Sequence, residues 1–279
     1  MKRKAFELVG SDGGPLRGEV RTAGGGEDRP AVVICHGFKG FKDWGFFPRL
    51  AERLATAGMT AVSFNFSGSG VGPDGESFSE PERFGRCTYT NDLADLATVT
   101  NALTNGDLLE GMPGTEHYGL FGHSRGGGIA VLHAALQPAV GALVTWAAIA
   151  KLLRWDVETI ERWRATGKQE VRNARTGEIL TLYTNMLDDI ESNRDLLDIP
   201  KAAAAIEAPW LIIHGADDES VPVAEARQLM DCAKPSSAEL KIISGGKHTL
   251  GAKHPWDGYS RELHEAMDAT VAWFANHLP

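Results

Sequence analysis

The sequence predicts an α/β protein with a mainly parallel sheet covered by helices on both faces. Two observations carry this prediction. Short apolar runs, each the length of a buried strand, alternate along the chain with longer stretches of helical character. The chain has 279 residues, 43% of them hydrophobic, which is enough for one large core. We therefore expect one sheet and one main body.

The expected elements follow a regular order. Strands at 6–9 and 16–20 form a hairpin across the turn that begins at Asp12, and a glycine loop at 24–26 follows. After this loop, helices are expected at 46–57 and 89–103, and strands are expected at 31–35, 60–64, 117–121, 142–146, 210–213 and 240–243. This alternation of strand and helix points to parallel pairing of the strands.

The stretch 150–206 breaks this rhythm. It is much longer than an ordinary connection between one strand and the next. We interpret it as a cap inserted after the sixth strand, so that residues 1–149 and 207–279 form the core and residues 150–206 form the cap. Because the insertion leaves the sheet at its carboxyl edge, the cap would exclude water and shape a substrate pocket.

Inside the cap we expect a helix at 151–164, a hairpin across the turn at 176–177, and a second helix at 185–197. Four large side chains of the cap are candidate linings of the substrate pocket: Trp155, Trp163, Tyr183 and Met186. The alternative is that these side chains only hold the cap to the body of the protein.

The segment with the clearest chemical meaning is the pentapeptide Gly-His-Ser-Arg-Gly at 122–126. It follows an apolar strand and precedes an apolar helix, which is the setting of the strained turn called a nucleophile elbow. Such a turn lifts the hydroxyl of Ser124 above the sheet. The flanking positions must be glycine, because a Cβ there would strike the neighbouring strand or helix. Ser124 is therefore the candidate nucleophile.

Partners for Ser124 appear downstream, in the order Ser, Asp, His that this architecture uses. The strand near 210–213 leads into an acidic loop, and the strand at 240–243 leads into a glycine-flanked loop that carries His248. A histidine can accept the serine proton and return it to the leaving group. A carboxylate bonded to the distal ring nitrogen selects the imidazole tautomer that serves this purpose.

Two choices within this triad stay open. Asp217 and Asp218 are adjacent, and we choose Asp218 because its spacing to the following Val-Pro pair leaves Asp217 one residue nearer the strand end. His254 is the main rival of His248 as the base. We prefer His248, because Pro255 follows His254 and the chain there already approaches the last helix.

The oxyanion of an acyl-transfer reaction also needs hydrogen-bond donors. One is usually the backbone N–H of the residue after the nucleophile, here Arg125, and the other comes from the loop after the third strand. That loop begins His-Gly-Phe-Lys-Gly at 36–40, where glycines let the backbone turn its amides toward the pocket. We assign the second donor to the N–H of Phe38.

Four motifs together carry a resemblance to a known family: His-Gly at 36–37, Gly-x-Ser-x-Gly at 122–126, Asp-x-x-Val-Pro at 218–222, and His248. The chain resembles an α/β-hydrolase of the serine esterase and peptidase kind, close in style to the dienelactone-hydrolase-like and cinnamoyl or feruloyl esterase groups. The resemblance covers nearly the whole chain. It implies the α/β-hydrolase fold and a Ser-His-Asp acyl-enzyme mechanism with no metal and no organic cofactor. It also implies that His36 and His123 are scaffolding of the oxyanion loop and the elbow.

Composition argues against several classes of partner. The formal net charge of −9 disfavours nucleic acid and anionic membranes, and we interpret the basic residues at 162–175 as a solvated helix face. No run of 18 apolar residues is present, and the basic start at 1–4 lacks the apolar core of a signal peptide. Three cysteines without metal spacing fit reduced thiols. We therefore expect a cytoplasmic protein with no metal site.

The leading functional hypothesis is a serine carboxylesterase that acts on moderate-sized, small-molecule esters, with an aryl or hydroxycinnamoyl preference under consideration. A second hypothesis keeps the triad but assigns amide substrates, as in aminopeptidases or acyl-peptide hydrolases, because esters and amides share the mechanism. A third is a catalytically silent scaffold that serves binding, and the intact triad argues against it. The sequence leaves the oligomeric state unknown.

Overall fold

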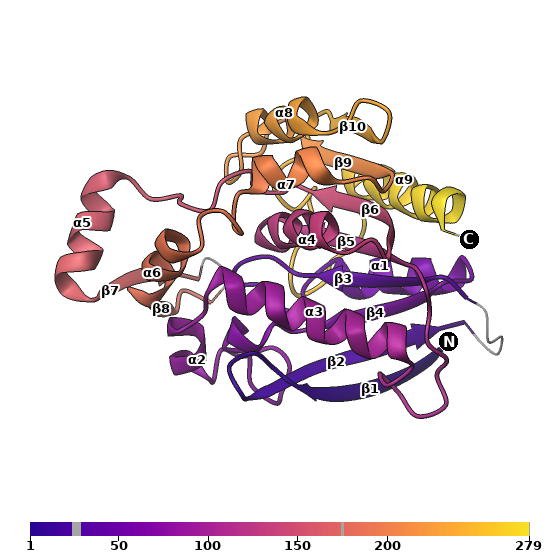
Figure 1. Ribbon diagram of the computed structural model, residues 1–279, viewed down its shortest axis with the longest axis horizontal. Coiled ribbons are helices and arrows are strands. Elements are labelled where there is room, and N and C mark those ends of the chain that lie inside the picture. The colour runs from indigo at the N-terminus through magenta and orange to yellow at the C-terminus, as the bar shows by residue number, and fades with distance from the viewer. Residues whose placement is uncertain (24–28, 174–175, 279) are drawn as a thin grey trace.

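An eight-stranded sheet runs through the centre of the protein (Figure 1). The computed structural model describes residues 1–23, 29–173 and 176–278. The predicted glycine loop at 24–26 and residues 174–175 of the predicted cap hairpin lie outside the described residues. The strands of the sheet are β1 (Lys2–Val9), β2 (Pro15–Thr22), β3 (Ala31–Cys35), β4 (Thr60–Phe64), β5 (Tyr118–His123), β6 (Val140–Trp146), β9 (Trp210–Gly215) and β10 (Ala238–Ile243).

The strands lie in the order β1-β2-β4-β3-β5-β6-β9-β10. The pairs from β4 to β10 are parallel, whereas β1 pairs with β2, and β2 with β4, in the antiparallel sense. The central strands β3, β4, β5 and β9 are buried along their whole length, as parallel strands covered on both faces must be. The predicted α/β fold with a mainly parallel sheet is confirmed.

Helices cover both faces of the sheet (Figure 1). The described helices are α1 (Phe47–Thr56), α2 (Pro81–Gly85), α3 (Tyr89–Asn105), α4 (Arg125–Leu136), α5 (Val157–Thr166), α6 (Asn185–Ser192), α7 (Ile199–Ala205), α8 (Val223–Cys232) and α9 (Arg261–His277), with a short 3-10 helix at Ser67–Ser69. One core holds the apolar faces of α3, α4, α7 and α8, and the other holds those of α1 and α9. No described helix is long and apolar enough to cross a membrane.

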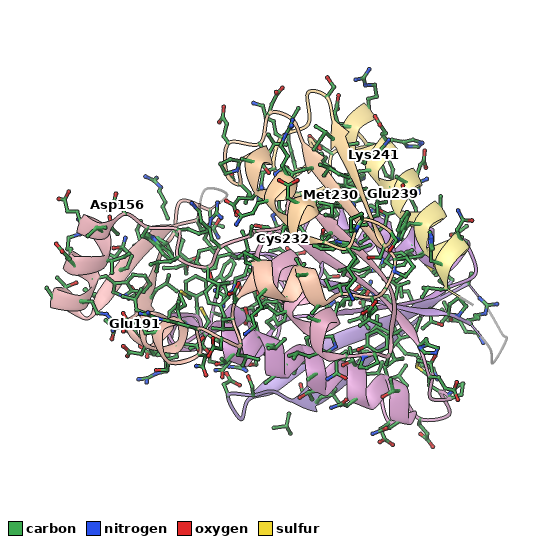
Figure 2. All side chains as sticks on the ribbon, turned by 45° about the horizontal axis from the view of Figure 1, so that its top comes forward. Asp156, Glu191, Met230, Cys232, Glu239 and Lys241 are labelled. Atoms are coloured by element: carbon green, nitrogen blue, oxygen red, sulfur yellow. The ribbon has the colours of Figure 1, made fainter. Side chains whose placement is uncertain are left out.

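The stretch between β6 and β9 contains the helices α5, α6 and α7 and a small antiparallel hairpin of β7 (Lys168–Arg172) and β8 (Ile179–Tyr183). The part formed by α5, the hairpin and α6 projects from the sheet (Figure 1), and we call it the projecting segment. Its outer positions include Asp156 and Glu191, which lie far from Lys241 of β10 (Figure 2). By contrast, α7 packs on α4 and α8 and belongs structurally to the body.

Two predicted cap helices are shorter than expected. The helix predicted at 151–164 begins only at Val157, because the Asp156 side chain accepts a hydrogen bond from the Thr159 N–H and so caps the first turn. The helix predicted at 185–197 ends at Ser192, where the Asn193 side chain bonds back to Asp189. The predicted hairpin is confirmed by the β7–β8 pairing.

Candidate active site

Ser124 occupies a sharp turn between β5 and α4. Its backbone has φ 56° and ψ −119°, a strained conformation that a serine keeps only where the surrounding structure enforces it. A Cβ on Gly122 would lie 2.4 Å from the Gly126 carbonyl oxygen, and one on Gly126 would lie 2.3 Å from the His36 carbonyl oxygen. Both flanking glycines are therefore required by close backbone contact, and the elbow geometry expected of the pentapeptide is present.

The structure brings together the three residues expected to form the triad. His248 Nε2 lies 3.1 Å from Ser124 Oγ, and His248 Nδ1 lies 2.8 Å from Asp218 Oδ2. The Asp218 side chain is completely buried, whereas that of His248 keeps 23% of its surface exposed. A buried carboxylate and a partly accessible imidazole are the arrangement that general-base activation of a serine needs.

The two rivals named from the sequence lie elsewhere. Asp217 is exposed, and the carboxylate that reaches His248 is that of Asp218. His254 accepts a hydrogen bond from the Gly45 N–H at Nδ1, 3.1 Å away, and its ring stacks against that of Trp44. The geometry thus favours Asp218 and His248 over Asp217 and His254.

The carboxylate of Asp218 is held by several donors. The N–H groups of Ser220 and Val221 donate to its Oδ1, at 2.8 and 2.9 Å. Burial alone would raise the pKa of Asp218, but the hydrogen bonds from His214, His248 and the Val221 N–H outweigh it and hold the pKa well below its usual range. Asp218 is therefore ionised at neutral pH and can stabilise an imidazolium on His248.

His123 supports the loop of His248. Its Nε2 lies 2.9 Å from the carbonyl oxygen of His248, so this nitrogen carries the proton and donates it. The two rings also lie against each other, with centroids 4.8 Å apart. Burial lowers the pKa of His123 to about 3, which keeps the ring neutral at neutral pH. His123 thus holds the His248 backbone in position and adds no charge to the site.

His36 supports the oxyanion loop in a similar way. Its Nδ1 donates to the Gly37 carbonyl at 2.9 Å, and the Phe66 N–H donates to its Nε2 at 3.2 Å. Burial lowers the pKa of His36 to about 4, so the ring is neutral and can accept the second bond. A Cβ on Gly37 would lie 3.1 Å from Ser124 Cβ. The loop therefore runs directly beside the nucleophile.

The two backbone N–H groups assigned to the oxyanion are those of Phe38 and Arg125. Arg125 is the first residue of α4, where amides have no partner inside the helix. Within the described part of the chain, no backbone acceptor outside the regular elements takes up either N–H group. Both remain available to a ligand.

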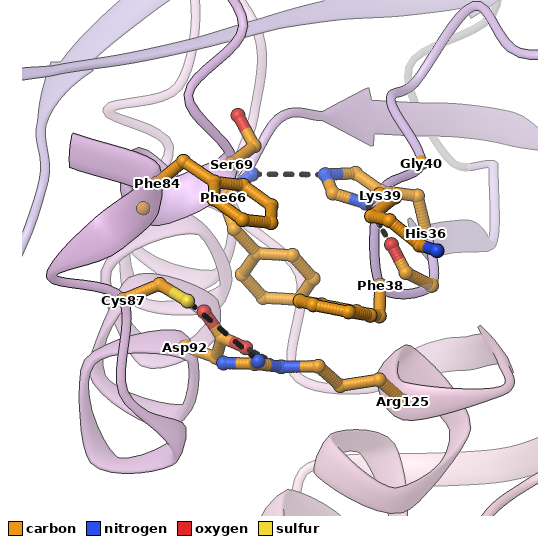
Figure 3. A pocket seen from close by; sticks show the side chains of 12 residues that line it. His36, Phe38, Lys39, Gly40, Phe66, Ser69, Phe84, Cys87, Asp92 and Arg125 are labelled. Carbon is orange, nitrogen blue, oxygen red and sulfur yellow. Dashed lines mark hydrogen bonds and ion pairs between the residues drawn. The ribbon is translucent and has the colours of Figure 1, made fainter. Parts of the chain in front are cut away.

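The side chain of Arg125 has a role that the sequence did not reveal. Its guanidinium is buried and donates to Asp92 Oδ2 at 2.7 Å (Figure 3). It also donates to the Thr88 carbonyl at 3.1 Å and lies 4.2 Å from the ring centroid of Tyr89. It also lies 5.7 Å from the ring centroid of Phe38. One arginine therefore connects the elbow to the start of α3 and to the oxyanion loop.

A cavity of about 20 Å³ lies between the oxyanion loop, α2 and α3, and Phe38, Phe84 and Arg125 are among its lining residues (Figure 3). This volume suits a water molecule rather than a substrate. Among the described residues, no group of three or more His, Cys, Asp or Glu is arranged to hold a metal ion.

None of the four predicted pocket residues lines this cavity. Trp163 and Met186 are fully buried in the core that extends into the projecting segment, and Trp155 packs edge-on against Trp163 with centroids 5.1 Å apart. The Tyr183 hydroxyl donates to Glu82 Oε1 of α2 at 2.8 Å. These contacts are the packing role that was the alternative interpretation of the same side chains.

Residues 26–196 and 191–252 match the family described as serine aminopeptidase, S33. The chain belongs to this family. This S33 protein is accordingly an enzyme of the serine hydrolase class, and the expected resemblance to α/β-hydrolases is confirmed.

Two relatives and one solved structure are similar to the S33 protein over most of its length. It is 28% identical to 2,6-dihydropseudooxynicotine hydrolase of Paenarthrobacter nicotinovorans, over 87% of this chain but only 58% of that protein's length. It is 24% identical to monoacylglycerol lipase of Mycolicibacterium smegmatis, over 90% of each chain. The structure of Est1E from Butyrivibrio proteoclasticus with ferulic acid bound superposes with a TM-score of 0.73 at 21% identity, covering 96% of this chain and 98% of Est1E.

Proposed function

We propose that this S33 protein is a serine carboxylesterase that hydrolyses moderate-sized esters with Ser124, His248 and Asp218 as its catalytic triad. The observation that carries the proposal is the continuous hydrogen-bonded chain from Ser124 Oγ through the His248 ring to Asp218. A serine at a strained elbow with a base 3.1 Å away is arranged for nucleophilic attack on a carbonyl carbon.

The reaction proceeds in two halves. As Ser124 Oγ bonds to the ester carbonyl carbon, His248 Nε2 takes the hydroxyl proton, and the Phe38 and Arg125 N–H groups stabilise the oxyanion. The bond from carbon to the alcohol oxygen then breaks, and His248 gives its proton to that oxygen. In the second half, His248 deprotonates a water that attacks the acyl carbon, and Ser124 leaves with its proton restored.

The relatives support an ester substrate. The named activities include a monoacylglycerol lipase, and a structural neighbour binds ferulic acid, an aromatic carboxylic acid. The description of the family names aminopeptidases, so the amide hypothesis makes a distinct prediction: turnover of aminoacyl arylamides at rates above those of matched aryl esters. We place hydroxycinnamoyl esters first in the substrate panel.

We further propose that the projecting segment acts as a cap over the site. Its hairpin reaches the oxyanion loop, where Lys39 Nζ donates to the Arg172 carbonyl at 2.8 Å. Its second strand and α6 reach α2 and α3 through Tyr183 and Asp189. Because α7 packs with the body, the proposed cap ends before Ile199 rather than at residue 206.

The proposal is tested with a fluorophosphonate probe and mass spectrometry of the purified protein, alongside the variants Ser124→Ala and His248→Ala. We expect the adduct on Ser124 in the wild type and no adduct in either variant, together with loss of ester hydrolysis. Full ester turnover by Ser124→Ala would refute the assignment. A well-folded protein that the probe leaves unlabelled would favour the binding-scaffold hypothesis.

A further inference from the structure

Lys39 stands one residue beyond the proposed oxyanion donor Phe38. Its backbone adopts φ 56°, a left-handed conformation that is uncommon for a residue with a Cβ. Its ammonium bridges two parts of the site: it donates to the Arg172 carbonyl at the end of β7, 2.8 Å away, and lies 5.6 Å from the ring centroid of Phe38. The charge therefore sits where the oxyanion loop meets the hairpin of the proposed cap.

In the part of the chain that the structure describes, no carboxylate lies within ion-pair distance of Lys39 Nζ. The carboxylate that lines the same cavity, that of Asp92, is bound to Arg125 at 2.7 Å. Partial burial lowers the pKa of Lys39, as expected of a half-buried cation without a nearby counter-ion.

The Lys39 ammonium also has more N–H donors than it has acceptors among the described residues. A lysine carries three N–H donors, and the Arg172 carbonyl is the acceptor found for Lys39 Nζ among the described residues. By contrast, Lys42, three residues further along the same loop, is bound to both Glu19 and Asp43. Of these two loop cations, Lys39 is the one left with capacity to bind a ligand.

We infer that Lys39 recognises a carboxylate on the acyl part of the substrate, so that the preferred substrates are half-esters of dicarboxylic acids. This inference rests on the proposed esterase function and narrows its substrate class. The proposed oxyanion donor Phe38 and Lys39 are consecutive residues of the loop that runs beside Ser124, and both line the cavity described above. A carboxylate there supplies a charged partner that this half-buried ammonium lacks among the described residues.

The test compares substrates that differ only in charge. The monoethyl esters of succinic, glutaric and adipic acid are each paired with the ethyl ester of the corresponding mono-amide, which has the same shape and no charge. We expect the wild type to prefer at least one acid over its amide by about tenfold or more in kcat/KM. Lys39→Met, which keeps the length and the backbone strain of the side chain, should remove most of this preference.

Two controls separate a specific contact from other effects. Lys201→Met removes the same charge from an exposed position on α7 and should leave the acid-to-amide ratio unchanged. Lys39→Arg should keep a ratio above one. Loosening of the proposed cap in Lys39→Met would slow both members of a pair equally, so the ratio reports the charge contact alone.

The outcomes distinguish this inference from the function on which it rests. Equal acid-to-amide ratios in wild type and Lys39→Met, with both esters hydrolysed, would overturn the carboxylate inference and leave the esterase proposal standing. Hydrolysis of neither member of any pair, with Ser124 unlabelled by the fluorophosphonate, would overturn both. A preference that Lys39→Met abolishes and Lys201→Met retains supports the inference.

Discussion

Three histidines surround Ser124, and their neighbours give each a different task. His248 is partly exposed and faces both the hydroxyl and a buried carboxylate. His123 and His36 are buried, and each donates one N–H to a backbone carbonyl of a loop that builds the site. Since burial disfavours their charged forms, only His248 is placed to move a proton during the reaction.

The neighbouring aspartates Asp217 and Asp218 give a matched pair of variants. We expect Asp218→Asn to lower kcat on the order of 10⁴-fold, because an amide at this position no longer fixes the reactive tautomer of His248 or stabilises its charged form. Asp217→Asn, at an exposed position, should change kcat by less than about twofold. Steady-state kinetics on one aryl ester, with circular dichroism to verify folding, makes the comparison. A large effect of Asp217→Asn alone would contradict the assigned triad.

For single residues, the motifs of the sequence name the members of the proposed triad but not the contacts that support them. The spacing of motifs was enough to name Ser124, His248 and the amide of Arg125 as candidates. The choice between adjacent aspartates depends on which one is buried, and no local pattern distinguished them strongly. The guanidinium of Arg125 binds Asp92 and Thr88 in a helix brought near only by folding, so its role left no signal in the pentapeptide.

At the level of elements, the projecting segment is tied to the start of α3. Asp189 of α6 accepts hydrogen bonds from the N–H groups of Tyr89 and Thr90, at 2.9 and 3.1 Å, and from the Thr90 hydroxyl at 2.5 Å. These amides belong to the first turn of α3, which has no intrahelical acceptors for them. The Asp189 carboxylate of α6 thus caps the N-terminus of α3.

We expect Asp189→Ala to lower the free energy of unfolding by about 1–3 kcal/mol, because it leaves buried donors of α3 without an acceptor. The neighbouring Asp188→Ala is the control. Asp188 is 59% exposed and pairs with Arg164 at the surface, so its loss should cost less than about 1 kcal/mol. Urea unfolding followed by tryptophan fluorescence measures both variants, and equal effects would rule out the proposed tie.

The elements of the body were predictable because their patterns are strong. Buried strands such as Ala31–Cys35 appear as unbroken apolar runs and were located correctly. The short helix at Pro81–Gly85 was missed, since five residues are too few for a periodic pattern. The two cap helices are shorter than the sequence predicts, because side-chain hydrogen bonds set their ends. Asp156 caps the start of α5, and Asn193 bonds back to Asp189 at the end of α6.

In the molecule as a whole, two layers of helices enclose the eight-stranded sheet, and polar side chains are buried in both cores. His36, His123 and His133 are all buried. His133 lies 2.8 Å from the Tyr118 hydroxyl, and burial lowers its pKa to about 4. A cytoplasmic location and the absence of a nucleic-acid partner are properties of the whole molecule, and both remain predictions from the sequence.

These buried histidines predict a pH dependence of stability. Their pKa values in the folded protein lie well below the ordinary value of 6.5, so the unfolded chain binds more protons between about pH 6.5 and pH 4. The free energy of unfolding therefore falls as the pH drops through this window, by up to about 1.4 kcal/mol per pH unit for each histidine. Asp92, whose pKa burial raises to about 6, opposes one of them.

Urea unfolding at pH 7, 6 and 5 tests this dependence. We expect stability to decrease at each step. His133→Gln, which cannot titrate and is remote from the triad, should flatten the slope, and the exposed His264→Gln should leave it unchanged. A free energy of unfolding that is constant from pH 7 to pH 5 would mean that the buried rings are already compensated.

The close contact between Gly126 and the His36 carbonyl has a consequence for the order in which the site forms during synthesis and folding. The elbow and the oxyanion loop meet only when β3 and β5 are already paired, and the base on His248 joins from a segment made long after Ser124. With Ser124 and His248 as the proposed nucleophile and base, a chain still under synthesis lacks the base that would activate Ser124 until His248 has been added and the sheet has formed.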